Sequence, residues 1–296
     1  MNAPRVSVVI ATQGRRDSFQ EALSSALSQS LHELEIVVVD DSPRAGSRWK
    51  EASSLAPLLG DPRVRVIAFN QSRGCAAAKN AGVRAARGTW VCYLDDDNFY
   101  RPEKVAKQLA LAEREGAPLV LCGIEFRASG RRRFSQVDYA EFTGDDLILK
   151  AQPDTNVLFH RRSGCPNWDE QLRTADDACF FHAVRRQHGL ERICNVPEAL
   201  VVYKTHTGVR ANSDGVAVYR GNRRLLVKWS RDFSKSARRR LLLRLLIASE
   251  KYRAGRWEYF ARLFGQLWKE GGRAEVRPMI NAIGVKIPLT RRWMVR

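Results

Sequence analysis

The chain has 296 residues, with 50 basic and 32 acidic side chains and a formal net charge of +18. This length is enough to bury a sizeable core and fits one large domain or two smaller ones. The composition is that of a globular protein without low-complexity tracts or repeats, and no apolar run approaches the roughly 20 residues that span a bilayer.

The cysteines argue against a zinc cluster and against a disulfide framework. None of them forms a C-x-x-C pair, and they are scattered singly: Cys75, Cys92, Cys122, Cys165, Cys179 and Cys194. The opening residues, MNAPRVSVVIATQGRR, lack the basic end, long apolar stretch and cleavage site of a secretory signal. We therefore expect reduced thiols and a cytoplasmic protein.

The positive charge is concentrated near the C-terminus. Residues 219–296 hold 21 basic and 5 acidic side chains, whereas residues 1–120 hold 16 and 14, and residues 121–218 hold 13 of each. This asymmetry predicts a body over residues 1–218, with halves at 1–120 and 121–218, and a basic region over 219–296 that meets something anionic.

The body alternates between strands and helices. Residues 6–12 (VSVVIAT) predict a strand, and Ser18 with Glu21 forms a capping box for the helix that follows. Residues 34–41 (LEIVVVDD) predict a buried strand, followed by a helix near 48–59 and a strand at 64–69.

The same alternation continues through the middle of the chain. An alanine-rich helix starts at Cys75 and is closed by Gly88, and residues 90–95 form the next strand. Pro102 opens a helix that runs to about Glu115, and residues 126–137 resemble a hairpin. Such alternation predicts an α/β fold with a mainly parallel sheet flanked by helices.

Two of the predicted strands end in carboxylates. Asp40 and Asp41 follow the second strand, and Asp95, Asp96 and Asp97 follow the fourth. Ligands of open α/β sheets bind beyond the carboxyl ends of the strands, and clustered carboxylates suit Mg²⁺ or Mn²⁺ shared with a diphosphate. On spacing alone, a turn at Asp41 and a helix cap at Asp97 explain these residues equally well.

Four segments in order resemble the inverting, GT-A-type nucleotide-sugar glycosyltransferases of family 2. They are VSVVIAT with SSALSQSLHELEIVVVDDSP; NQSRGCAAAKNAGVRAARGTWVCYLDDDNFYRPEKV; NWDEQLRTADDACFFHAVRR; and YKTHTGVRANS. They cover roughly residues 5–210. The resemblance implies a GT-A-like, Rossmann-related fold and a metal-dependent transfer of sugar to an acceptor hydroxyl, in bacterial glycan, polysaccharide or glycoconjugate biosynthesis.

The resemblance also implies the residues that hold the donor. Thr12 and Asp41 would hold the nucleotide base, with Asp41 accepting the N3 hydrogen of uracil, and Lys79 would lie near the base or the phosphates. A UDP-sugar is therefore expected first, a dTDP-sugar next and a GDP-sugar last. Asp96 would reach the ribose.

Three residues are implied as ligands of Mn²⁺ or Mg²⁺. Asp95 and Asp97 match the outer positions of the D-x-D motif, and Asp97 is the first choice as direct ligand. Three successive aspartates fit the motif in more than one register, so the ligands are either Asp95 with Asp97 or Asp97 largely alone. His206 in YKTHTG matches the late histidine of the family, and a lone loop histidine is otherwise a surface or packed residue.

The catalytic base is implied in TADDACFF. Inverting transfer requires a carboxylate that takes the acceptor proton, and the motif assigns this role to Asp177, with Asp176 beside it. Relatives usually carry Glu then Asp here, whereas this chain has two aspartates. The alternative is that both cap the helix that follows.

Trp168 and Asp169 would lie near the sugar and the acceptor. A tryptophan face can stack on a pyranose, and core packing explains the same residue equally well.

The basic C-terminal region is expected to be helical. Its apolar stripe of Trp257, Phe260, Ala261, Phe264 and Trp268 suits an anionic membrane surface at the inner face of the membrane, packing on the body, or a dimer interface. Two other classes remain: a sugar nucleotidyltransferase, which would usually carry a glycine-rich first loop, and a nucleic-acid-binding protein, which the acidic strand ends disfavour.

Overall fold

The computed structural model describes residues 3–14, 16–42, 55–128, 131–135, 153–204 and 215–252, together with positions 265 and 269. The chain divides into two compact units, residues 1–209 and 210–296. The division into functional halves and a tail at residue 218 stays a prediction.

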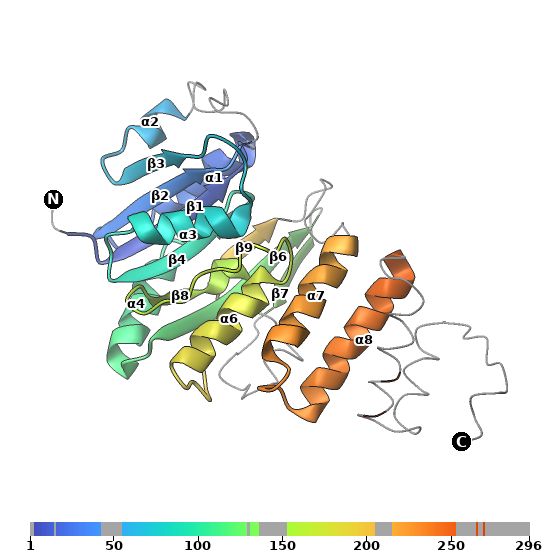
Figure 1. The fold of residues 1–296 in the computed structure, drawn as a ribbon. Coiled ribbons are helices and arrows are strands. Elements are labelled where there is room, and N and C mark those ends of the chain that lie inside the picture. The colour runs from blue at the N-terminus through green and yellow to red at the C-terminus, as the bar shows by residue number, and fades with distance from the viewer. Residues whose placement is uncertain are drawn as a thin grey trace, which may run out of the picture. The chain divides into compact units, whose positions relative to one another are not determined.

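The first unit is built on one sheet, in which nine strands are described (Figure 1). Its order is β3-β2-β1-β4-β8-β6-β9-β5, and β7 pairs with β6 off this path. The strands are β1 (Val6–Thr12), β2 (Leu34–Asp40), β3 (Val64–Ala68), β4 (Trp90–Asp95), β5 (Asn98–Tyr100), β6 (Leu119–Ala128), β7 (Arg131–Ser135), β8 (Phe159–Arg161) and β9 (Cys194–Lys204).

The α/β fold is confirmed, and the sheet is mixed rather than mainly parallel. The pairs β1–β2, β1–β4, β2–β3 and β6–β9 are parallel. Strands β5, β7 and β8 run antiparallel to their partners. Only Asp96 and Asp97 separate β4 from β5, too few residues for a parallel crossover, which needs a dozen or more. The antiparallel pairing of β6 with β7 confirms the predicted hairpin strands.

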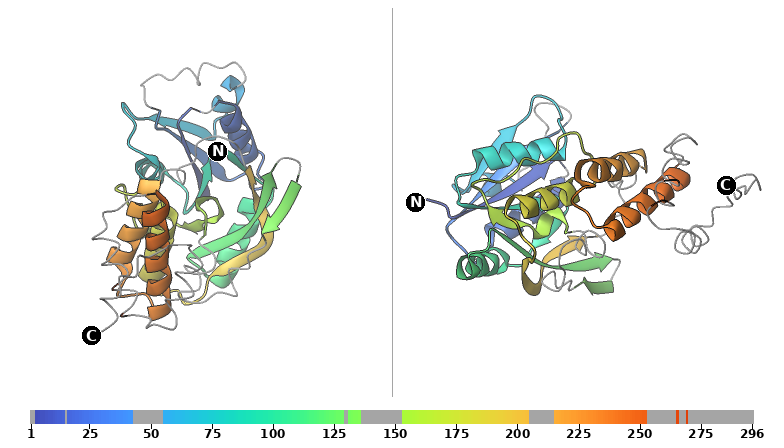
Figure 2. Two further views of the ribbon diagram at one scale, coloured as in Figure 1. Left: turned by 90° about the vertical axis from the view of Figure 1, so that its right-hand side faces the viewer. Right: turned by 60° about the horizontal axis from the view of Figure 1, so that its bottom comes forward.

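Helices cover both faces of this sheet (Figures 1 and 2). Alternate side chains of the parallel strands point to opposite faces: Ile36 and Val38 share the main core with α1, whereas Val37 and Val39 meet Ala78 of α3. The helices of this unit are α1 (Arg16–Leu27), α2 (Ala56–Leu59), α3 (Cys75–Ala85), α4 (Lys104–Glu115), the 3-10 turn η3 (Thr155–Val157) and α6 (Asp176–Gln187).

Three predicted helix boundaries are wrong. Helix α4 begins at Lys104 with Glu103 as its N-cap, so Pro102 precedes this helix and does not open it. Helix α1 begins at Arg16, so Ser18 lies within its first turn and does not precede it as a cap. Helix α3 ends at Ala85, and Gly88 serves a close approach instead, because a Cβ there would lie 2.7 Å from the backbone nitrogen of Ser7. Of the helix expected near residues 48–59, residues 48–54 lie outside the described part of the chain.

The described part of the second unit contains two helices that pack against each other. They are α7 (Gly215–Trp229) and α8 (Lys235–Tyr252). The buried side chains of the two helices and of the turn between them, which contains Phe233, are Tyr219, Leu225, Phe233, Ala237, Leu241, Leu242 and Leu245. No described helix is both long enough and apolar enough to cross a membrane. The stripe of Trp257, Phe260, Ala261, Phe264 and Trp268 lies outside the described residues.

Candidate active site

The carboxyl ends of β1, β2 and β4 lie side by side. Thr12 is in register with Asp40, and Ala11 is in register with Asp95. The sheet therefore gathers at one edge the predicted residues of three segments that are up to 84 positions apart, as Thr12 and Asp96 are.

Asp41 is held by the loop before α3. Its Oδ1 accepts from the backbone nitrogens of Arg73 at 2.5 Å and Gly74 at 3.2 Å, and its Oδ2 accepts from the Ser72 hydroxyl at 3.0 Å. The side-chain amide of Gln13 donates to Oδ2 at 3.4 Å, the longest of these contacts. The buried carboxylate thus joins the β1 and β3–α3 loops.

Asp96 is tied to the end of β1. Its Oδ2 accepts from the hydroxyl of Thr12 at 2.7 Å and from the backbone nitrogen of Gln13 at 3.4 Å. The Thr12 oxygen in turn accepts from the Gly14 nitrogen at 3.0 Å. Thr12, Asp41 and Asp96, the residues predicted to hold the nucleoside, therefore lie in one buried group.

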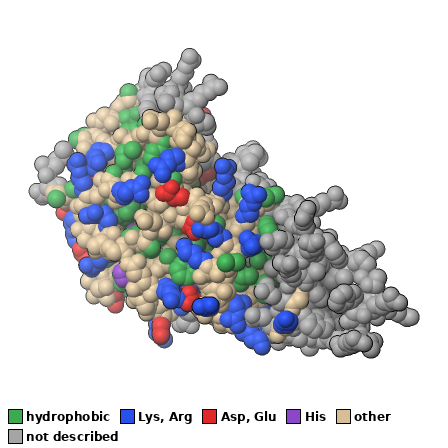
Figure 3. Space-filling view, viewed as in Figure 1, with side chains coloured by type: hydrophobic (Ala, Val, Ile, Leu, Met, Phe, Trp, Pro, Cys, Tyr) green, Lys and Arg blue, Asp and Glu red, His purple; other side chains and the backbone are tan. Residues whose placement is uncertain are grey.

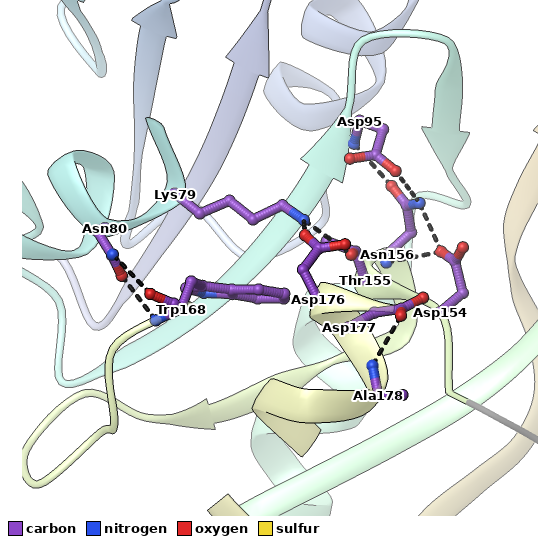
Figure 4. Close-up of polar contacts among 10 residues, drawn as sticks. All are labelled: Lys79, Asn80, Asp95, Asp154, Thr155, Asn156, Trp168, Asp176, Asp177 and Ala178. Carbon is purple, nitrogen blue, oxygen red and sulfur yellow. Dashed lines mark hydrogen bonds and ion pairs between the residues drawn. The ribbon is translucent and has the colours of Figure 1, made fainter. Parts of the chain in front are cut away.

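Asp95 belongs to a second group, the Asp95 cluster (Asp95, Asp97, Asp154 and Asn156). The side-chain oxygen of Asn156 accepts from the Asp95 nitrogen at 2.7 Å, and its side-chain nitrogen donates to Asp95 Oδ2 at 2.9 Å and to Asp154 Oδ1 at 2.6 Å (Figure 4). Burial, together with the negative charges of Asp154 and Asp97, raises the pKa of Asp95 to about 7, against the opposing charge of Lys79.

The donor atoms of this cluster fit a hard divalent cation. Carboxylates that raise one another's pKa are stabilised by a cation between them, and Mg²⁺ is usually held by one or two carboxylates plus substrate phosphates. Within the described ranges, no group of three or more His, Cys, Asp or Glu side chains is arranged so that these side chains alone could hold a metal ion. The predicted ligand His206 lies outside the described residues.

The carboxylates predicted to include the base occupy the first turn of α6. Ala175, just before the helix, has φ 57° and contributes no side-chain cap, so Asp176 and Asp177 are the first two helical residues rather than the cap. Asp177 Oδ1 accepts from the Ala178 nitrogen at 2.7 Å. Burial and the charges of Asp176 and Asp154 raise the pKa of Asp177 to about 7.

Lys79 joins α3 to the start of α6. Its ammonium lies 3.1 Å from Asp176 Oδ2 and 3.0 Å from the hydroxyl of Thr155, and 4.1 Å from the ring centroid of Trp168 (Figure 4). Burial lowers the pKa of Lys79, but the carboxylates of Asp176 and Asp95 raise it well above its ordinary value. Lys79 therefore remains charged beside the two carboxylate groups.

Trp168 is packed in the core. Its side chain is 2% exposed, its ring stacks on Phe180 at 4.0 Å between centroids, and it meets the edge of Tyr93 at 5.0 Å. Because Phe180 covers one face of the Trp168 ring and Lys79 lies over the ring, the packing favours a role for Trp168 in the core over stacking on a sugar.

Asp169 is half-buried, and its carboxylate accepts from the Gln171 nitrogen at 3.2 Å.

Sequence reasoning missed three residues of the site: Asp154, Thr155 and Asn156. Burial raises the pKa of Asp154, which is also an acceptor for the Asn156 backbone nitrogen at 2.8 Å. The available signal was the aspartate of PDTN, because an Asp side chain often accepts from the backbone nitrogen two residues further on, in a turn or at a helix cap. Nothing in that signal points to Asp95.

Comparisons with known proteins show which family the chain resembles. The model of the family "Glycosyl transferase family 2" matches residues 7–194. The succinoglycan biosynthesis protein ExoO of Rhizobium meliloti (strain 1021) is 35% identical over 159 residues, which are 53% of this chain and 44% of that protein. The chain therefore matches less than half the length of this relative.

Two solved structures share the fold. That of S. aureus TarS 1-349 in complex with UDP-GlcNAc has a TM-score of 0.66 and 17% identity, covering 90% of this chain and 81% of that one. The mannosyltransferase PcManGT from Pyrobaculum calidifontis, in complex with GDP-Man and Mn²⁺, has a TM-score of 0.56 and 17% identity, covering 96% and 85%. The likeness to these structures shows the fold. The family match covers more than half of the chain, and it leads to one conclusion: the chain belongs to glycosyltransferase family 2.

Proposed function

We propose that the chain transfers a sugar from a nucleotide sugar, a UDP-sugar first, to an acceptor hydroxyl, with inversion at the anomeric carbon. The observation that carries the proposal is the environment of Asp177, a half-buried carboxyl at the N-terminus of α6 whose pKa is raised to about 7. A general base works best when its pKa lies near the operating pH. Family membership supports the reaction type.

The proposed reaction is a single displacement. The acceptor oxygen forms a bond to the anomeric carbon as the bond from that carbon to the diphosphate oxygen breaks, and the nucleoside diphosphate leaves with the electron pair. The acceptor proton passes to the Asp177 carboxylate. Because one displacement occurs and no covalent enzyme intermediate forms, the configuration inverts.

Donor binding is proposed at the group of Thr12, Asp41 and Asp96. A uracil N3–H would replace the 3.4 Å contact from Gln13 on Asp41, the longest of the contacts to that carboxylate. Thymine offers the same N–H, so a dTDP-sugar is the second candidate. The TarS structure with UDP-GlcNAc and the PcManGT structure with GDP-Man support a nucleotide-sugar donor.

Mn²⁺ or Mg²⁺ is proposed at Asp95 and Asp97. When bound, the cation would neutralise charge that develops on the departing diphosphate. Asn156 would fix Asp95 through its two hydrogen bonds, and the raised pKa of Asp95 supports a cation at this position. The neighbour solved with Mn²⁺ agrees with this proposal.

The biological setting is proposed to be bacterial polysaccharide biosynthesis at an anionic membrane surface. The similarity to a succinoglycan biosynthesis protein supports the first part. The second rests on α7 and α8, where residues 215–252 hold 11 basic and 2 acidic side chains. Basic side chains are also spread over the face of the molecule seen in Figure 3.

One face of α7 suits such a surface. Val216, Arg220, Arg223 and Val227 recur at helical spacing, and all four are exposed, Val216 at 39% and Val227 at 68%. Two arginines flanked by exposed valines combine attraction to anionic lipid headgroups with apolar insertion.

The test is a thermal-shift screen of nucleotide sugars with Mn²⁺ or Mg²⁺, followed by product analysis. A UDP-sugar should stabilise the protein only when the metal is present, because ligands that bind the native state raise its stability. With an acceptor, the product should be UDP. Release of pyrophosphate from a nucleoside triphosphate would identify a nucleotidyltransferase instead and overturn the proposal.

A further inference from the structure

Lys79 lies in the buried stretch of α3, with a side chain that is 4% exposed. A buried ammonium must find partners for its donors or lose its charge. Asp176 and Thr155 accept from Lys79 at 3.1 and 3.0 Å, and the Trp168 ring receives it at 4.1 Å (Figure 4). Its partners are therefore protein groups that lie between 76 and 97 residues further along the chain.

Asn80, the next residue of α3, hydrogen-bonds to the segment just before α6. The Asn80 side-chain oxygen accepts from the Trp168 nitrogen at 2.8 Å, and its amide nitrogen donates to the Trp168 oxygen and to Glu170 Oε1, both at 3.0 Å. Trp168 in turn stacks on Phe180 of α6, with ring planes 1° apart. Two successive residues of α3 therefore fasten both the segment before α6 and the helix itself.

The two carboxylates at the start of α6, those of Asp176 and Asp177, have different partners. Asp176 receives the ion pair with Lys79, whereas Asp177 bonds to the Ala178 nitrogen. If the ammonium were lost, two adjacent carboxylates would face the Asp95 cluster with less compensating charge, and their mutual repulsion would favour other side-chain positions.

From these contacts we infer that Lys79 is a positioning residue, which holds Asp176 and the start of α6 so that Asp177 faces the acceptor, and is not a ligand of the nucleotide sugar. The inference rests on the proposed function of Asp177 and assigns to Lys79 a different role from the nucleotide contact implied by the family resemblance.

The test compares Lys79→Met, which keeps the length of the side chain and removes the charge, with Lys107→Met, which removes an exposed ion pair with Glu198. Lys79→Met should lower kcat by about 10- to 100-fold, the cost of misplacing a reacting group, and leave the donor KM and Kd within about threefold. Lys107→Met should leave kcat, KM and Kd unchanged. A tenfold rise in donor Kd for Lys79→Met with kcat retained would make Lys79 a donor ligand and overturn the inference.

The route through Asp176 is tested by a double-mutant cycle. The loss in kcat for Lys79→Met with Asp176→Asn should be no larger than that for Lys79→Met alone, because both changes break one interaction. Losses that multiply would contradict this route. If Lys79→Met does not fold, Asp176→Asn tests the same ion pair. In that variant kcat should fall and the donor Kd should stay constant, and any other result would contradict the inference.

A readout without turnover separates this inference from the proposed function. Amide hydrogen exchange at residues 176–179 should quicken in Lys79→Met, with unchanged affinity for UDP measured by titration, and stay at the wild-type rate in Lys107→Met. If the wild-type protein transfers no sugar but this pattern appears, only the proposed function fails. If exchange is unchanged, the positioning role fails.

Discussion

Asn156 holds Asp95 from two sides. Its amide oxygen accepts from the Asp95 backbone nitrogen and its amide nitrogen donates to the Asp95 carboxylate, across 61 positions of sequence. The same amide nitrogen reaches Asp154, so one neutral side chain connects two carboxylates whose pKa values are both raised.

Replacing this connector should weaken the proposed metal site. We expect Asn156→Ala to lower Mn²⁺ affinity, measured with UDP present, by about 10- to 100-fold, because residues that orient a metal ligand have effects of this size. It should also lower the free energy of unfolding by about 1–3 kcal/mol, since buried groups lose their partners. Asn222→Ala removes a contact with the Val218 carbonyl on α7 and serves as the control. Unchanged Mn²⁺ affinity in Asn156→Ala would contradict the role.

The pH dependence of transfer should report Asp177. With saturating Mn²⁺, which lowers the pKa of a coordinated Asp95, kcat/KM should rise with pH through an inflection near 7, because the base must be ionised. Asp177→Asn should lower kcat by about 10²–10⁴-fold and leave donor affinity intact. A flat wild-type profile between pH 5 and pH 8 would remove Asp177 from this role.

The Asp177 carboxyl should also make the folding stability depend on pH, but stability should fall with rising pH whereas activity rises. Because the folded-state pKa of Asp177 is raised, the native state holds this proton more tightly than the unfolded state, and stability is lost as pH rises from the unfolded value of 3.8 towards 7. Asp177→Asn should therefore unfold at a higher urea concentration than wild type at pH 8, with the difference vanishing below pH 4. Equal midpoints at pH 8 would contradict the raised pKa.

Ala175 is the described non-glycine residue with a positive φ, and it directly precedes the two carboxylates of α6. The left-handed backbone conformation costs an alanine about 1–2 kcal/mol, and a glycine avoids this cost. Part of the gain in stability is lost again, because an unfolded glycine has more conformational entropy to lose on folding. Ala175→Gly should raise the free energy of unfolding by about 0.5–1 kcal/mol. Ala183→Gly, inside the same helix, should lower it by about 1 kcal/mol. Urea unfolding checks both signs, and a destabilised Ala175→Gly would rule out the strain.

The exposed face of α7 should bind anionic vesicles. Arg220→Glu with Arg223→Glu should weaken co-sedimentation with phosphatidylglycerol vesicles by about 30-fold or more, since each basic residue near such a surface contributes about 1 kcal/mol. Arg114→Glu with Arg192→Glu makes the same charge change at exposed positions of the first unit and should have little effect. Indifference of the wild-type protein to anionic lipid would exclude a membrane partner.

The sequence predicted the parallel strands β1 and β2 and the carboxylates at their ends well, because these features are encoded locally. The β-branched runs of β1 and β2 mark buried strands, and the carboxylates follow them directly, so their meeting at one edge follows from parallel pairing. The antiparallel strands were harder. β5 and β8 have three residues each, too short for a periodic pattern, and their places in the sheet depend on partners far along the chain.

Long-range contacts also explain what was missed in the site. Asn156 gains its role only when β8 enters beside β4, and the burial of Trp168 depends on Phe180 and Lys79, which no local pattern around Trp168 reveals. The roles of Thr12, Asp41, Asp95, Asp96, Asp97, Asp176, Asp177, Asp169 and His206 stay predictions.

The position of β8 between β4 and β6 limits how this enzyme can be recombined. A chimaera that exchanged residues 121–218 for those of a relative, in order to change the acceptor, would also exchange Asp154 and Asn156, and with them the support of Asp95. It would also separate Lys79 and Asn80 from the partners that they hold around Trp168 and α6. Residues 1–120 and 121–218 are therefore not independent modules, and an exchange that preserves the proposed metal site must carry PDTN and the residues facing α3 unchanged.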